Sequence, residues 1–156
     1  MIQVDIPDWG PLRLAHLVLD YNGTLAVDGI PRAGVARRLT RLARDLEVHV
    51  LTADTFGKVR EGMQGVPCSL TILEPGAQDQ GKLDFVRRLG PGKTCAMGNG
   101  RNDRLMLEAA ALGVAVILAE GAAAASLNAA DVVCRSINDA LDLLIHPLRL
   151  VATLRA

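Results

Sequence analysis

The chain has 156 residues, half of them hydrophobic, and its 17 basic and 17 acidic side chains give a net charge of zero. This length and composition predict one domain with a substantial core, and the balanced charge argues against a disordered tail or a surface for polyanions. Aromatic residues make up only 3% of the chain, which argues against binding of nucleic acid by base stacking.

Two further features indicate the compartment. Cys68, Cys95 and Cys134 are odd in number, far apart and without the spacing of metal ligands, so we interpret them as free thiols. The first residues do not resemble a signal peptide, and the longest apolar stretch, residues 109–119, is too short to span a bilayer. We therefore expect a soluble cytoplasmic protein that binds neither membrane nor nucleic acid.

The amino-terminal part of the chain reads as strands. Residues 2–6 and 12–14 alternate apolar and polar around a turn, which predicts a β-hairpin at a sheet edge. Residues 17–19 are branched aliphatics without polar alternation, a pattern typical of a strand buried on both faces of a parallel sheet. That strand ends at Asp20, and Asn22 and Gly23 then predict a turn.

Strands and helices alternate through the rest of the chain. This order predicts an α/β fold, a three-layer Rossmann-like parallel sheet with helices on both faces, as one domain over residues 1–156. His49 lies between two valines, and we interpret it as structural. The predicted helices cover 35–46, 55–63, 78–89, 104–112, an alanine-rich segment near 122–125 and two closing segments, and the strands cover 48–52, 69–73, 94–97, 114–118 and 131–133.

Four polar features follow the predicted strands or lie on the next helix: Asp20, Thr52, Lys82 and the turn at residues 99–103. Each has an ordinary structural explanation, such as a turn or helix cap or an exposed helix position. Parallel sheets, however, bring the carboxyl ends of their strands to one edge, where ligands bind. All four features in this order therefore predict a functional site.

These features resemble the four motifs of the haloacid dehalogenase (HAD) superfamily of aspartyl-nucleophile phosphotransferases. The motifs correspond to DYNGT at residues 20–24, Leu51-Thr52, Lys82 and GNGRND at 98–103. Within the superfamily the chain is most similar to the phosphorylation domain of P-type ATPases and to soluble P-type ATPases. The stretches DYNGTLA, LTAD and AMGNGRND are similar to their DKTGTLT, LTGD and AMxGDGxND.

The resemblance implies an enzyme, a Mg²⁺-dependent HAD-like hydrolase with an aspartyl-phosphate intermediate on its nucleophile. The catalytic residues would be Asp20, Asn22, Thr52 and Lys82. Phosphate would contact Thr52, Ala53 and Lys82 together with Asn22 and Gly23. Mg²⁺ would bind Asp20, the backbone carbonyl of Asn22, Asn99 and Asp103.

Two positions depart from the usual pattern. Asn22 replaces the acid that most phosphatases of the superfamily carry, and an amide cannot exchange a proton, so we expect slow turnover. Asn99 replaces a usual Mg²⁺-ligating Asp, so we expect weaker metal affinity and a firmer hold on a phosphate dianion.

Connection lengths are informative about the substrate. The segments from Asp20 to Val35 and from Thr52 to Lys82 leave no room for a cap domain, so we expect an open site. An open site suits a large phosphorylated substrate or a homo-oligomer in which another subunit covers it.

Two alternatives differ in class. The first is a non-catalytic, phosphate-responsive or protein-interaction module on the same fold, in which Asn22 and Asn99 mark lost chemistry. The second is a receiver domain of two-component signalling, which also uses Asp, Thr and Lys at strand ends. Receiver domains need an acidic pair at the first strand, which residues 2–6 lack.

Overall fold

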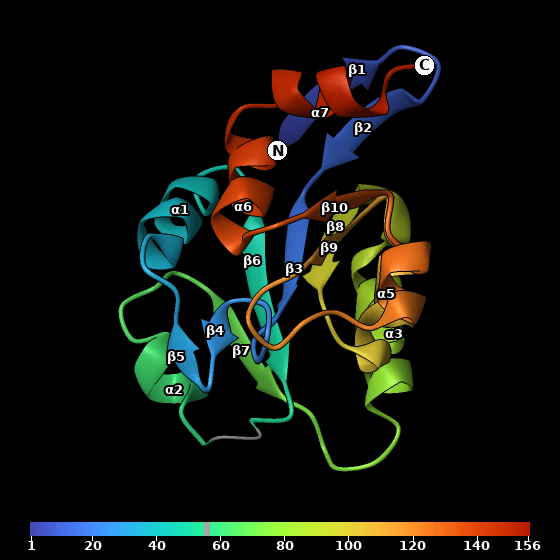
Figure 1. Ribbon diagram of the computed structural model, residues 1–156. Helices are drawn as coiled ribbons and strands as arrows, with labels where there is room; N and C mark the ends of the chain where they lie inside the picture. Colours follow the sequence, from blue (N-terminus) through green and yellow to red (C-terminus); the bar gives the residue numbers. More distant parts are fainter. Residues whose placement is uncertain (55–56) are drawn as a thin grey trace.

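A parallel sheet forms the centre of the computed structural model, which describes residues 1–54 and 57–156 (Figure 1). Neighbouring strands pair in parallel throughout the sheet. The spatial order is β7 (Ser69–Ile72), β6 (Glu47–Thr52), β3 (His16–Asp20), β8 (Thr94–Gly98), β9 (Leu112–Val116) and β10 (Val132–Cys134). The chain starts the sheet at β3 and builds outward first on one side and then on the other, so the switch of direction lies beside β3. This is the point where ligands bind in doubly wound sheets.

Strand β3 is buried along its whole length, and Leu17, Val18 and Leu19 are fully inaccessible. Helices cover both of its faces, which explains why the sequence shows an apolar run and not an alternating pattern. The prediction of a buried strand that ends on Asp20 is confirmed.

Two helical layers complete the three-layer fold (Figure 1). On one face, α1 (Val35–Leu42) and α6 (Ile137–Ile145) bury their apolar sides against Leu17 and Leu19 of β3. On the other face, α3 (Gln78–Leu89) and α4 (Arg104–Ala109) pack on Val18 of β3, with α5 (Ala124–Ala129) beside α4. The remaining helical elements are α2 (Val59–Gly62), α7 (Leu148–Leu154) and the short 3₁₀ turns η1 (Pro91–Lys93) and η2 (Arg101–Asp103).

The predicted amino-terminal hairpin forms, as β1 (Ile2–Ile6) and β2 (Gly10–Leu14), but its predicted position at an edge of the main sheet is wrong. The hairpin is a separate two-stranded sheet that packs against α7. Strands β7 and β10 already form the two edges, and the apolar side chains of the hairpin are buried in the same core cluster as Leu150 of α7.

A second hairpin, β4 (Ala26–Val27) and β5 (Ile30–Pro31), turns at residues 28–29. We call residues 22–31 the flap. The flap is the connection between β3 and the segment that leads into α1, as the sequence predicted.

Some element boundaries differ from the predictions. The strand predicted at 114–118 forms two residues earlier, as β9 (Leu112–Val116). Gly113 allows this early start because it has no side chain: a Cβ there would lie 2.4 Å from the Leu107 carbonyl oxygen. Helix α4 accordingly ends at Ala109, and α1 ends at Leu42 although the apolar spacing continues. Of the helix predicted at 55–63, residues 55–56 lie outside the described residues, and only α2 (Val59–Gly62) is helical, so the prediction is too long at residues 57, 58 and 63. No described helix is long and apolar enough to cross a membrane.

Candidate active site

Three buried charged side chains meet at the carboxyl end of β3. Asp20 ends the strand, Lys82 comes from the second turn of α3, and Asp103 ends η2. The Lys82 ammonium donates to Asp20 Oδ1 at 2.7 Å and to Asp103 Oδ1 at 2.6 Å. Two carboxylates share one cation, so the three groups together carry one net negative charge inside the protein.

This charge imbalance is visible in the pKa values. Burial, together with the charge of Asp103, raises the pKa of Asp20 from 3.8 to about 6, although Lys82 and Thr24 oppose the shift. Burial alone would lower the pKa of Lys82, but the charges of Asp20 and Asp103 outweigh burial and raise it. Lys82 therefore remains charged at neutral pH, and Asp20 is a carboxylate that any added cation would stabilise further.

Thr24 and Asn99 complete the surroundings of Asp20. The Thr24 hydroxyl lies 3.1 Å from Asp20 Oδ2 and 3.2 Å from Asn99 Oδ1, so both oxygens face the same small space. The orientation of the Asn99 amide is fixed on its other side, because its Nδ2 donates to the carbonyl of Gly121 at 3.0 Å. Asn99 thus presents an oxygen, and not a nitrogen, toward Asp20.

The turn after β8 holds Asp103 in place through the backbone. The amides of Asn99 and Gly100 donate to Asp103 Oδ2 at 2.9 and 2.8 Å. Gly98 is required for this approach, because a Cβ there would lie 2.5 Å from the Asp103 carboxyl carbon. The sequence GNG at this turn therefore serves to bring the backbone within hydrogen-bonding distance of a buried carboxylate.

Thr52 and Asn22 form the outer part of the site. Thr52 Oγ1 accepts the Asp54 amide at 2.9 Å and the Asn22 Nδ2 at 3.5 Å. The Thr52 hydroxyl proton makes no hydrogen bond within the described part of the chain and is free for a ligand. Asn22 Oδ1 is buried and also lacks a partner among the described residues. Ala53, also predicted to bind phosphate, follows Thr52 and is half-buried.

The oxygen donors at this site fit Mg²⁺. The Asp20 carboxylate and Asn99 Oδ1 converge on one space, and Asp103 accepts from the same Lys82 ammonium as Asp20. The expected Asn22 ligand is its backbone carbonyl, which is distinct from the side-chain Oδ1 that is unpaired within the described residues. Hard cations take carboxylate and carbonyl oxygens, and the net negative charge of the cluster favours a cation.

Several contributors had no assigned role in the sequence. Thr24 stands within the quoted motif, four residues after Asp20, but its contact with Asp20 needs the turn geometry. Glu120 accepts the Asp28 amide of the flap at 3.0 Å, and its other oxygen would lie 2.7 Å from a Cβ on Gly23. In the sequence Glu120 only marks the end of an apolar stretch.

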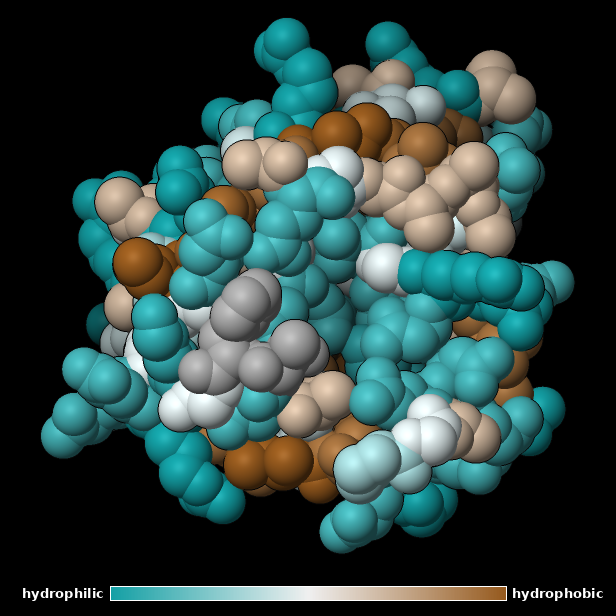
Figure 2. All heavy atoms as spheres, turned by 60° about the horizontal axis from the view of Figure 1, so that its bottom comes forward, coloured by the Kyte–Doolittle hydropathy of each residue, from teal (hydrophilic) through white to brown (hydrophobic). Residues whose placement is uncertain are grey.

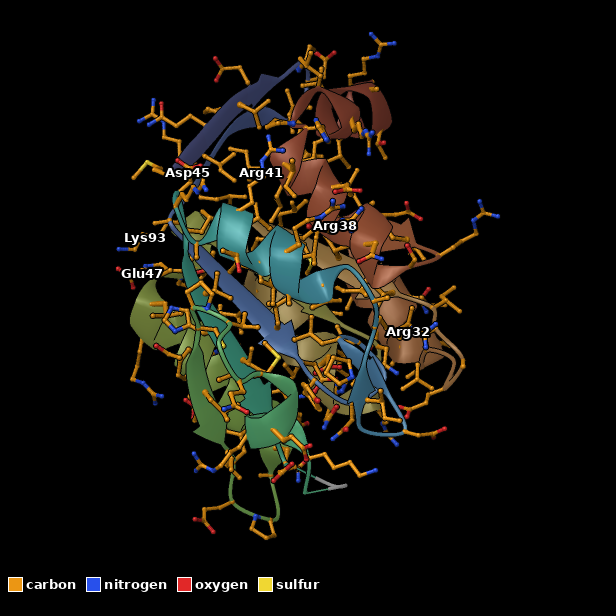
Figure 3. The ribbon with its side chains drawn as sticks, turned by 90° about the vertical axis from the view of Figure 1, so that its left-hand side faces the viewer. Arg32, Arg38, Arg41, Asp45, Glu47 and Lys93 are labelled. Atoms are coloured by element: carbon orange, nitrogen blue, oxygen red, sulfur yellow. The ribbon has the colours of Figure 1, made fainter. Side chains whose placement is uncertain are left out.

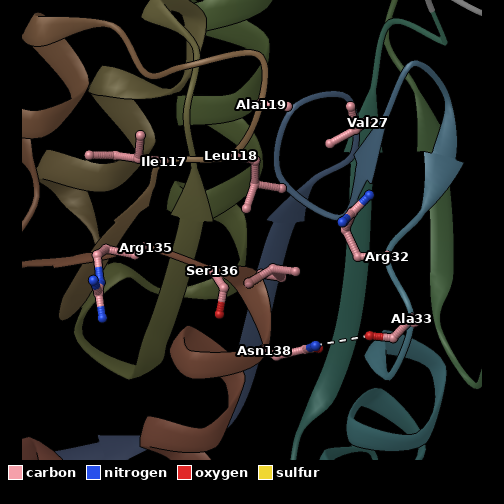
Figure 4. Close-up of a pocket in the computed structure, with 10 residues that line it drawn as sticks. Val27, Arg32, Ala33, Ile117, Leu118, Ala119, Arg135, Ser136 and Asn138 are labelled. Carbon is pink, nitrogen blue, oxygen red and sulfur yellow. Dashed lines mark hydrogen bonds between the residues drawn. The ribbon is translucent and has the colours of Figure 1, made fainter.

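The site lies on a largely hydrophilic face that is hollowed near its middle (Figure 2). A separate cavity of about 550 Å³ lies between the flap and the segments after β9 and β10, and none of the predicted site residues lines it (Figure 4). Arg32 and Arg135 are its charged lining residues, and Asn138 donates to the Ala33 carbonyl beside it at 2.9 Å. The Asp20 cluster is compact because the Lys82 ammonium fills the space between its carboxylates.

Comparison with known proteins gives two kinds of relatives. No family model matches the chain. The uncharacterized protein MJ0073 of Methanocaldococcus jannaschii is 46% identical over 74 residues, which are 47% of this chain and 80% of that protein. The uncharacterized protein MJ0072 of the same organism is 49% identical over 39 residues, 25% of this chain and 89% of that protein.

Solved structures with a similar fold include a putative HAD superfamily hydrolase from Legionella pneumophila, with a TM-score of 0.72 at 17% identity, covering 90% of this chain and 87% of its own. A cobalt-bound deoxy-D-mannose-octulosonate 8-phosphate phosphatase from Haemophilus influenzae has a TM-score of 0.72 at 15% identity, covering 90% of this chain and 92% of its own. The corresponding enzyme from Moraxella catarrhalis, in complex with magnesium, phosphate and the sugar KDO, has a TM-score of 0.71 at 10% identity, covering 89% and 90%. The chain therefore belongs to the family of the uncharacterized M. jannaschii protein MJ0073 and has the fold of the haloacid dehalogenase superfamily.

Proposed function

We propose that the protein is a Mg²⁺-dependent phosphatase or phosphotransferase that works through an aspartyl phosphate on Asp20. The observation that carries the proposal is the burial of Asp20 at the switch point of the sheet, where it shares Lys82 with Asp103. Support also comes from the fold, since the similar structures include phosphatases, one of them in complex with magnesium and phosphate.

In the first step one Asp20 oxygen attacks the phosphorus, and the bond from phosphorus to the leaving oxygen breaks with its electron pair. The leaving oxygen takes a proton from solvent, and the phosphoryl group stays on Asp20. In the second step water attacks the phosphorus and gives up a proton to solvent, the bond from phosphorus to Asp20 breaks with its electron pair on the carboxylate, and inorganic phosphate leaves.

Electrostatic stabilisation supplies most of the catalysis in phosphoryl transfer. Lys82 carries the positive charge that faces Asp20. The Thr52 hydroxyl, which makes no donor hydrogen bond within the described residues, can donate to a phosphoryl oxygen. Asp20, Asn22, Asn99 and Asp103 would hold Mg²⁺, which supplies further charge neutralisation when bound.

Asn22 determines the turnover rate that we expect. It stands where an acid would protonate the leaving group and then activate water, and an amide does neither. General acid–base catalysis typically contributes about 10²–10⁴-fold, so we expect slow turnover and a long-lived phosphoenzyme. This expectation agrees with the resemblance to P-type ATPase phosphorylation domains.

The expected substrate is a phosphorylated compound that an uncapped site admits, including large ones. Between β3 and α1 the described chain places only the flap and a short loop. A homo-oligomer in which a second copy covers the hydrophilic face would restrict the size of the substrates that reach the site.

A hydrolysis assay tests the proposal. Phosphate release from acetyl phosphate and from an aryl phosphate is measured with Mg²⁺ and with chelator, for the wild type and for Asp20→Asn. We expect slow, Mg²⁺-dependent release that Asp20→Asn abolishes while its circular dichroism spectrum stays unchanged. Equal release by Asp20→Asn would contradict the proposal, and no release or phosphorylation at all would favour the non-catalytic module.

A further inference from the structure

A second cluster of potential ligands lies at the opposite end of the sheet from Asp20. His16 begins β3, Glu47 begins β6, and His49 lies two residues further along β6. The strand register pairs His16 with Glu47 and Val18 with His49, so the three side chains project from the same face of the sheet. Asp20 lies four residues after His16 along β3, roughly 13 Å away at the usual rise per strand residue.

The three side chains converge on one point. One ligand atom from each lies within 4.8 Å of the other two. His16 Nδ1 is 3.3 Å from Glu47 Oε2, and His49 Nε2 is 3.9 Å from the same oxygen. A tetrahedral ion about 2.0–2.2 Å from each ligand separates two ligands by roughly 3.3–3.5 Å. The His16–Glu47 distance already has this value, and rotation of the Glu47 side chain would shorten the other.

Three imidazole nitrogens of this cluster make no hydrogen bond within the described residues. His16 Nδ1 and both ring nitrogens of His49 are buried without a hydrogen-bond partner, and the 3.3 Å contact to Glu47 lacks hydrogen-bond geometry. Leaving a buried polar group unpaired costs about 1–3 kcal/mol, so native structures rarely tolerate several together. A cation at the convergence point would engage the lone pairs of both rings.

The surroundings favour ligand binding over a simple ion pair. His16 and His49 are 7% and 8% exposed, whereas the Glu47 side chain is 72% exposed. Glu47 lies at the outer edge of the fold, where an ion and a water ligand have access (Figure 3). The rings of His49 and Phe85 pack edge to face with centroids 5.4 Å apart, so the imidazole lies against α3.

We propose that His16, Glu47 and His49 form a site for a transition-metal ion of the Zn²⁺ class, with water as the fourth ligand, at the amino-terminal ends of β3 and β6. Two imidazoles and one carboxylate suit Zn²⁺ or Co²⁺, whereas Mg²⁺ prefers oxygen ligands alone. The bound ion would join two neighbouring strands far from the Asp20 cluster and stabilise the fold.

Co²⁺ is the probe for the test, because tetrahedral Co²⁺ absorbs visible light. Chelator-stripped protein, with excess Mg²⁺ to occupy the Asp20 site, is titrated first with Co²⁺ and then with Zn²⁺. We expect one Co²⁺ per chain, displacement by Zn²⁺, and a higher melting temperature with Zn²⁺.

Two variants test whether Glu47 and His49 are ligands of the bound ion. Glu47→Gln changes an exposed side chain, leaves the fold intact and should weaken Co²⁺ binding by about 10–100-fold or more. His49→Gln should abolish binding. Asp45→Asn is the matched control, because it makes the same carboxylate-to-amide change at an exposed position two residues away, and it should bind Co²⁺ like the wild type.

Three results would overturn the proposal. The first is the absence of a visible Co²⁺ band, and the second is binding that Glu47→Gln and His49→Gln leave unchanged. The third is binding that disappears in Asp20→Asn or after alkylation of Cys68, which would assign the ion to the Asp20 cluster or to a thiol. The Asp20→Asn arm keeps this test separate from that of the proposed phosphatase activity.

Discussion

Lys82→Met removes the one cation that Asp20 and Asp103 share. Methionine has nearly the same length and flexibility, so the change deletes the charge with little change in packing. Removing one partner of a buried ion pair typically costs 3–5 kcal/mol, and here two carboxylates at 2.7 and 2.6 Å lose their partner together. We therefore expect the free energy of unfolding to fall by about 3–5 kcal/mol at neutral pH without metal.

The loss should depend on pH with a defined sign. Asp20 has a pKa of about 6 in the folded protein against 3.8 ordinarily, so folding retains a proton that the unfolded chain has released. Stability from this group therefore falls as pH rises from about 4 to 6, by roughly 3 kcal/mol in the wild type. Without Lys82 the folded pKa is higher still, so the decline continues above pH 6 and the gap between variant and wild type widens toward pH 8.

Urea unfolding followed by circular dichroism, in chelator at several pH values, measures this gap. Lys93→Met is the control, because Lys93 is exposed and should change stability by less than about 0.5 kcal/mol. Adding Asp20→Asn to Lys82→Met should recover part of the loss. A loss for Lys82→Met below about 1 kcal/mol, or one of equal size at every pH, would refute the account of the buried charges.

Three further substitutions probe other contacts. Gly23→Ala places a Cβ 2.3 Å from Asn99 Nδ2 at a φ of +80°, so phosphate release should fall by more than about tenfold, while Gly65→Ala, which imposes a similar φ of +76° with open space around it, should retain activity. Asn99→Asp turns an oxygen toward the Gly121 carbonyl and should cost about 1–3 kcal/mol without metal, yet tighten Mg²⁺ binding in calorimetry; unchanged Mg²⁺ affinity would contradict the assignment of Asn99 as a ligand. Asp142→Asn removes the charge and one of the two oxygens that accept from Arg38 at 2.9 Å between α6 and α1 (Arg38 is labelled in Figure 3), and urea unfolding should show a loss of about 0.5–1 kcal/mol. Because the hydrogen bond from Arg38 lowers the pKa of Asp142, that difference should be present at neutral pH and vanish as the pH falls below 4; a constant difference would contradict it.

The order of the elements could be predicted from the sequence because local patterns carry it. The apolar run before Asp20 and the spacing of the helix at 78–89 each reflect one buried element. The position of the first hairpin could not be predicted, since a hairpin pattern states which residues pair but not which surface its apolar face covers.

The candidate site shows the same division. Asp20, Lys82 and Asp103 stand in recognisable motifs, but their sharing of one charge depends on distances between elements that no local pattern contains. The contact of Glu120 with the flap could not be predicted either, because its partner, the Asp28 amide, lies 92 residues earlier in the chain. His49 read as a solitary structural histidine because only the strand register brings His16 of the neighbouring strand beside Glu47 and His49, which share one face of β6.

Intact-mass spectrometry of the protein after brief incubation with acetyl phosphate and Mg²⁺ is the most direct test of Asp20 as a phosphoryl acceptor. The account predicts a single phosphate adduct that persists in the wild type, is absent in Asp20→Asn, and decays about 10²-fold or more faster in Asn22→Asp, which restores an acid beside the nucleophile. An adduct that survives in Asp20→Asn, or that decays equally fast in the wild type and Asn22→Asp, would contradict it.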